Sequence, residues 1–123
     1  MEKNFVDDVR KLKVFSVAYD VSIEIHKRSL LFPKIEQYAL ADQMRRVSKS
    51  VCANLAEGFI KQSHSKPEFK RYITFSLGSA NEMMLWLSYA FDLGYIEGQE
   101  FQKWSKMYNS VISMMISLRN KIK

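Results

Sequence analysis

The sequence predicts an all-α protein, an up-down antiparallel four-helix bundle. Apolar residues recur at spacings of three and four along the chain, and no alternating strand pattern competes with them. The chain contains only four Gly and two Pro, and most of them fall where the apolar pattern is interrupted. Since 123 residues suit one hydrophobic core, residues 1–123 are expected to form a single domain.

The first two helices are separated by Phe32-Pro33. The first is expected over about residues 12–29, and its packing face carries Val14, Ala18, Val21 and Ile25, with Phe15 beside them. The second is expected over about residues 40–62, and steps of four and three give it the packing face Leu40, Met44, Val47, Val51 and Asn54.

The last two helices have clear boundary signals. Ser65 followed by Glu68 is a capping box for a helix over about residues 66–93, and Gly94 is placed to end it. Its packing face is Phe69, Ile73, Ser76, Ala80, Met83, Leu87 and Ala90. A fourth helix over about residues 97–122 has the packing face Phe101, Trp104, Tyr108, Val111, Met115, Leu118 and Ile122. The alternating spacing is typical of left-handed packing between neighbouring helices.

Two of these helices carry apolar or small residues away from their packing faces, which predicts self-association. The expected interface residues are Ala53, Ala56 and Ile60 on the second helix and Phe75, Leu85, Trp86, Tyr89 and Leu93 on the third. The alternative is that the N-terminal arm and the connection over residues 29–39 cover this surface within one subunit.

Positive charge is concentrated in two segments of a chain whose net charge is +6 and whose pI is about 9.5. Residues 45–71 contain seven Lys or Arg against two Glu, and residues 101–123 contain five Lys or Arg and no acid. This asymmetry favours a polyanionic partner, RNA or another nucleic acid, although a solubilising role is the alternative. The candidate nucleic-acid-binding residues are Arg45, Arg46, Lys49, Lys61, Lys66, Lys70, Arg71, Arg119 and Lys121. Without a recognisable reading motif, binding is expected to be led by phosphate contacts.

No pattern in the sequence indicates catalysis, a cofactor or a small-molecule substrate. His26 and His64 lack ligand spacing for a metal, and neither is placed to activate Cys52 or a serine. A single cysteine and the absence of an apolar leader or membrane span point to a cytoplasmic protein with no membrane partner. We therefore expect a protein that is not an enzyme.

A polar group on the second and third helices is expected to fix helix register rather than to bind a ligand. Its members are Asn54, Glu57, Ser79 and Glu82. Gly58 indicates that another backbone passes close to the second helix, and Gly78 suggests the same for the third.

Several runs resemble the four-helix-bundle proteins encoded in intervening sequences of bacterial 23S ribosomal RNA genes. They begin with Leu12-Lys13-Val14-Phe15, Phe32-Pro33 with Glu36 and Tyr38, and Gln43-Met44-Arg45-Arg46. The most recognisable run is Asn54-Leu55-Ala56-Glu57-Gly58-Phe59, and later landmarks are Glu68-Phe69, Gly78-Ser79, Glu82 and Leu93-Gly94-Tyr95-Ile96. Phe15 stands where the family often has Trp, and Ala39 and Ala41 stand where Gly and a Ser or Thr cap are usual. The similarity covers about residues 10–120.

The resemblance implies a bundle that assembles into a ring, a homopentamer, with no established enzymatic activity. A related branch comprises accessory proteins of diversity-generating retroelements, which bind a reverse transcriptase and nucleic acid. Two roles are thus in competition: an oligomer that presents basic surface to RNA, associated with the ribosome or its RNA, and a protein-interaction scaffold for a reverse transcriptase. The family settles the fold better than the role.

Overall fold

The computed structural model describes residues 9–123, which form four long α-helices and one 3-10 turn. The helices are α2 (Lys13–Ser29), α3 (Leu40–Lys61), α4 (Lys66–Asp92) and α5 (Gly98–Lys121), and η1 (Lys34–Glu36) lies between α2 and α3. Observed helix ends differ from the predicted ends by at most one residue. The short η1 was not predicted. The N-terminal arm, residues 1–8, lies outside the described residues.

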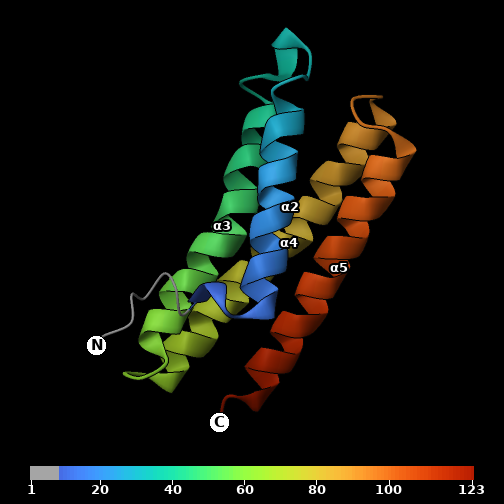
Figure 1. The fold of residues 1–123 in the computed structure, drawn as a ribbon. Helices are drawn as coiled ribbons and strands as arrows, with labels where there is room; N and C mark the ends of the chain where they lie inside the picture. The colour runs from blue at the N-terminus through green and yellow to red at the C-terminus, as the bar shows by residue number, and fades with distance from the viewer. Residues whose placement is uncertain (1–8) are drawn as a thin grey trace.

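The four helices form an up-down bundle in which each helix packs on two neighbours (Figure 1). Helices α2 and α4 both pack against α3 and α5, and the backbones of the two diagonal pairs lie farther apart. One end of the bundle holds the α3–α4 turn and the C-terminus (Figure 1). The opposite end holds the α2–α3 connection and the α4–α5 turn, so residues far apart in the sequence meet at each end.

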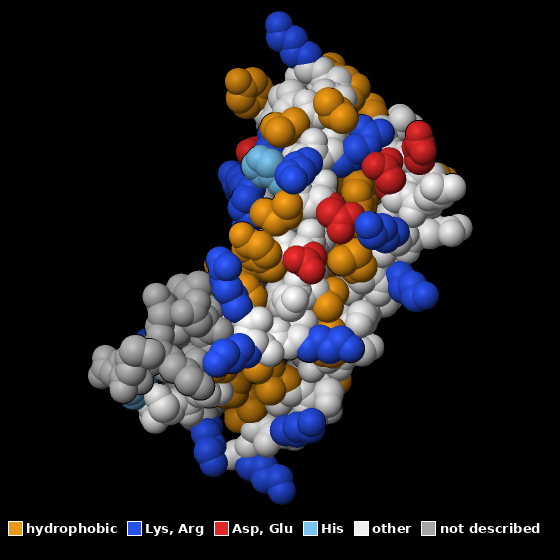
Figure 2. Space-filling model, viewed as in Figure 1, with side chains coloured by type: hydrophobic (Ala, Val, Ile, Leu, Met, Phe, Trp, Pro, Cys, Tyr) orange, Lys and Arg blue, Asp and Glu red, His pale blue; other side chains and the backbone are white. Residues whose placement is uncertain are grey.

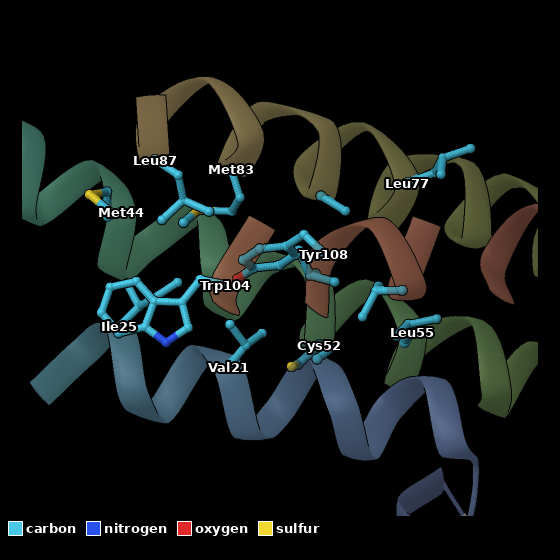
Figure 3. Close-up of a cluster of buried hydrophobic side chains, with 14 of the residues drawn as sticks. Val21, Ile25, Met44, Cys52, Leu55, Leu77, Met83, Leu87, Trp104 and Tyr108 are labelled. Carbon is cyan, nitrogen blue, oxygen red and sulfur yellow. The ribbon is translucent and has the colours of Figure 1, made fainter. Parts of the chain in front are cut away.

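The predicted packing face of α4 is buried in full, and Trp104, Tyr108, Val111 and Met115 of α5 are buried opposite it. Tyr108 lies in the middle of the core, with side chains of the other helices around it (Figure 3). Among the described residues its hydroxyl has no hydrogen-bond partner, and burial raises its pKa.

The predicted packing face of α3 was wrong at two positions, Val47 and Asn54. Val47 is only half-buried, whereas the next residue, Ser48, is fully buried. Leu55, which is 1% exposed, occupies the core after Val51, whereas Asn54 is only half-buried. The helix takes a step of four residues here instead of the expected three, and Gly58 follows on the same buried face.

Gly58 allows α3 and α4 to approach closely, as predicted. A Cβ atom at this position would lie 3.2 Å from the Cβ of Tyr72 and 3.5 Å from the backbone oxygen of Phe69. The same expectation was wrong for Gly78 within this chain, because a Cβ there would meet no atom within 4 Å. Gly94, with a φ of 80°, ends α4 in the left-handed region that glycine favours.

Alanine substitution should change stability differently at the two helical glycines, Gly58 and Gly78. Gly78→Ala is expected to raise the free energy of unfolding by about 1 kcal/mol, because alanine is the better helix former. Gly58→Ala should give less than this gain, or a loss, because its new methyl group would press on the Cβ of Tyr72 on α4. Urea denaturation followed by circular dichroism measures both, and equal gains at the two sites would contradict the close approach of α3 to α4.

Candidate nucleic-acid interface

Lysines from three helix ends gather at the end of the bundle that holds the α3–α4 turn. The antiparallel topology brings together the last turn of α3, the first turns of α4 and the last turn of α5. We call the group the basic end; it comprises Lys61, Lys66, Lys70, Lys121 and Lys123. Figure 2 shows Lys and Arg side chains, without Asp or Glu, on the lower part of the visible face.

Two shallow hollows at the basic end are shared by α4 and the C-terminus. The larger, about 470 Å³, is lined by Gln62, Ser63, Lys66, Phe69, Lys121, Ile122 and Lys123. The smaller, about 250 Å³, is lined by Lys66, Pro67, Lys70, Ile122 and Lys123. The sequence missed Gln62 and Ser63, whose only signal is their place in a polar turn. Each hollow therefore has an apolar floor and a rim of ammonium groups.

These lysines lie at well-defined helix ends. The Ser65 side chain accepts a hydrogen bond from the backbone N–H of Glu68 at 3.2 Å, and Pro67 occupies the first turn, so α4 starts sharply. Arg119 and Lys121 lie in the last turn of α5, where positive charge is favourable. Within residues 9–123, no ion pair engages Lys66, Lys70, Lys121 or Lys123.

The remaining predicted basic residues do not all join this surface. Arg71 lies 3.6 Å from Glu68 and stacks over the Phe75 ring at 5.3 Å. Arg46 and Lys49 lie on α3, away from the basic end; Arg46 is 3.7 Å from Asp42, and Lys49 Nζ is 2.8 Å from His26 Nδ1. Burial and the charges of Lys49 and Arg45 lower the His26 pKa.

Arg45, one of the predicted nucleic-acid-binding residues, holds the α2–α3 connection through hydrogen bonds. Its guanidinium donates to the Ser29 hydroxyl at 2.9 Å and to the Gln37 backbone oxygen at 2.8 Å. The Gln37 amide in turn donates to the backbone oxygens of Ser29 and Phe32 at 2.9 and 3.0 Å. The sequence pattern indicated only that Arg45 is a positive residue near a helix start. It did not predict these hydrogen bonds, because their partners lie 8 and 16 positions away in the chain.

Replacing Arg45 should damage stability and spare any nucleic-acid binding. Arg45→Met is expected to lower the free energy of unfolding by about 1–3 kcal/mol, since partly buried acceptors lose their donor. Thermal unfolding measures this loss of stability, and filter binding measures the affinity for RNA. Arg46→Met, which removes the same charge from an exposed side chain, is the matched control; an equal loss in both variants would contradict the structural role.

The predicted polar group forms only a partial network. Asn54 donates to the Ser50 hydroxyl at 3.0 Å, and Ser50 lies 3.1 Å from the Ser79 hydroxyl, so the three residues connect α3 to α4. Glu82 instead accepts a hydrogen bond from the Trp86 indole at 2.9 Å. In the described part of the chain, exposed Glu57 has no hydrogen-bond or ion-pair partner. Ser50, which the sequence did not single out, is the link.

The predicted self-association residues fall on two separate faces. Phe75, Leu85, Tyr89 and Leu93 are exposed along the outside of α4, and Trp86 is half-buried among them. Ala53 and Ala56 instead line an apolar hollow of about 360 Å³ between α2 and α3, together with Phe15, Tyr19 and Ile23 among others. Exposed Ile60 lies one turn further along α3. The connection borders only one end of the α4 face and leaves it exposed.

The structure offers little for catalysis in residues 9–123. Cys52 is buried, and desolvation raises the pKa of its thiol to about 11, so the thiolate needed for nucleophilic attack is scarce at neutral pH. The described His, Cys, Asp and Glu side chains form no group of three that could hold a metal ion. None of the described helices is both long and apolar enough to cross a membrane.

Fold and surface together define a four-helix bundle with positive charge gathered at one end. The sequence profile of the 23S rRNA-intervening sequence protein family matches residues 10–117, and the chain belongs to this family. A crystal structure of a protein of unknown function from the S23 ribosomal protein family of Bacteroides thetaiotaomicron shares the fold, with a TM-score of 0.75 and 20% identity. That similarity covers 86% of this chain and 97% of the other. No curated protein is significantly similar to this chain.

Proposed function

We propose that the protein is a non-enzymatic, self-associating bundle that presents its basic end to RNA. The observation that carries this proposal is a set of lysines around two adjoining hollows that have no ion-pair partner within residues 9–123. Their neighbour Glu68 is engaged by Arg71, so it offsets little of their charge. Polyanion binding of this kind draws its free energy from the release of counterions.

Self-association strengthens a surface of this kind. One subunit supplies only a few phosphate contacts, each of them weak in water. Several copies facing the same way hold several basic ends at high local concentration, and avidity multiplies the affinity. The exposed outer face of α4 supports such assembly, and the ring of five subunits suggested by the family resemblance is the arrangement we favour.

The chemistry of the basic end favours the backbone of RNA over its bases. Lysine is a flexible point charge, and the residues that line the hollows include one amide side chain, Gln62, and no Arg or Asn to read base edges. Binding should therefore tolerate many sequences. The names of the family and of the S23 ribosomal protein neighbour fit RNA, and 23S ribosomal RNA is the first molecule to test.

Charge reversal at the basic end should weaken RNA binding and its dependence on salt. In Lys66→Glu/Lys121→Glu, we expect the affinity for 23S rRNA fragments to fall at least tenfold at low salt. The slope of log K against log[salt] should become shallower by about two for each subunit in contact, since roughly one counterion is released per phosphate. Fluorescence anisotropy between 50 and 200 mM salt measures both.

The matched control is Lys27→Glu/Lys106→Glu, which makes the same change in net charge at exposed lysines away from the basic end. It should retain most of the affinity. Equal losses in the two variants would mean that overall charge, and not the basic end, drives binding. A wild-type affinity that does not change with salt would contradict the proposal outright.

A second candidate role is a scaffold for a protein such as a reverse transcriptase. The exposed apolar side chains of α4 favour it, because a surface of that kind suits a protein partner as well as a second copy. A reverse transcriptase gene beside the gene for this chain would support the scaffold, whereas a position inside a ribosomal RNA gene would support the first role.

A further inference from the structure

The most exposed large apolar side chains of the described residues lie on the α2–α3 connection. Tyr38 is 96% exposed, Ile35 83%, Leu31 75% and Leu30 56%. Figure 2 shows hydrophobic side chains gathered at the upper end of the molecule, opposite the basic end. We call Leu30, Leu31, Lys34 and Ile35 the apolar tip. Neither the core nor the basic end accounts for it.

The connection that carries the apolar tip is held in one conformation from inside. Arg45 and Gln37 bind its backbone, as described above, and buried Phe32 packs on Tyr95 with ring centroids 5.3 Å apart. The Tyr95 hydroxyl donates to Glu36 at 2.8 Å, which fixes η1 against the α4–α5 turn. Because the backbone is already ordered, a partner that covers the tip pays little entropy for ordering it.

A cleft of matching chemistry lies at the same end of the bundle but on another face. It has a volume of about 400 Å³ and is lined by Glu36, Tyr38, Ala39, Leu40, Asp42, Gln43, Trp86, Tyr89 and Leu93. We call it the aromatic cleft. The bond from Trp86 to Glu82 fixes the indole, whose centroid is 5.8 Å from the Tyr89 ring. Its lining includes the carboxylates of Glu36, which accepts from the Tyr95 hydroxyl at 2.8 Å, and of Asp42, which lies 3.7 Å from exposed Arg46.

We propose that the apolar tip of one subunit docks in the aromatic cleft of a second copy of this chain. Leu31 and Ile35 supply apolar groups to Trp86, Tyr89 and Leu93, and Lys34 supplies a cation to the carboxylate rim. Contact between copies through this end also avoids placing lysine against lysine, as contact through the basic end would.

This contact joins two different surfaces of the chain, so it is heterologous. The tip follows α2, whereas the cleft lies between the start of α3 and the end of α4, so each subunit keeps one free tip and one free cleft until a ring closes. Tip and cleft lie at the same height along the bundle, which suits parallel subunits with all basic ends on one side. The inference rests on the self-association in the proposed function and specifies its contact.

Complementary variants test the contact directly. Leu31→Asp/Ile35→Asp disables the tip, and Tyr89→Asp/Leu93→Asp disables the cleft, each by changing exposed side chains only. Alone, each variant should be a 14.4 kDa monomer by light scattering, with the circular dichroism of the wild type. Mixed in equal amounts, they should form a heterodimer and nothing larger, because one intact tip then meets one intact cleft. Ile116→Asp, at a partly exposed isoleucine of α5, is the control and should keep the wild-type mass.

A charge exchange tests the polar part without introducing charge into an apolar surface. Lys34→Glu should weaken assembly at low salt, and adding Asp42→Lys should restore it. Variants that keep the wild-type mass, or a mixture that stays monomeric, would overturn the tip-and-cleft contact while leaving RNA binding untouched. A monomeric wild type would overturn the contact together with the proposed self-association.

Discussion

Helix α4 has more apolar surface than its two neighbours in the bundle can cover, and this constraint governs the rest of the molecule. One side of α4 packs on α3 and α5, with Gly58 of α3 allowing the close approach. The other side carries Phe75, Leu85 and Tyr89 into solvent. A partner that covered these side chains would gain about 25 cal/mol for each Å² of apolar surface that it buried.

Lysines and carboxylates are concentrated at opposite ends of the bundle. Lysines are concentrated at the end where α3, α4 and α5 meet the α3–α4 turn and the C-terminus, and the carboxylates of Glu36 and Asp42 lie at the other end. In the proposed assembly, contact between copies at the end with carboxylates would keep the lysines out of the interface itself. In the function that we propose, assembly and polyanion binding would use different parts of each subunit, so one would not compete with the other.

The helices were predicted well because their signals lie within each helix and at its ends. Alternating apolar steps and the breakers at Pro33, Ser65 and Gly94 place each helix end within a residue. Side-chain partners were harder to predict. Arg45 looked like a surface cation because Ser29 and Gln37 lie in other elements, and Asn54 was placed in the core because strict alternation continued one step too far.

The candidate site was predictable only in part, for the same reason. Antiparallel topology suffices to bring Lys66, Lys70 and Lys121 to one end. It does not show that Arg46 and Lys49 lie elsewhere on α3, or that Glu82 binds the Trp86 indole. The exposed connection was missed because a leucine in a loop has no period from which its surroundings can be inferred.

Acrylamide quenching of tryptophan fluorescence over a dilution series tests most directly whether the outside of α4 is covered. The chain has two tryptophans, of which Trp104 is buried in the core and Trp86 lies on the outer side of α4. If copies of the subunit cover α4, both should be protected at high concentration, and Trp86 should become quenchable on dilution. A quenchable fraction that is already present at high concentration and does not change on dilution would contradict the account.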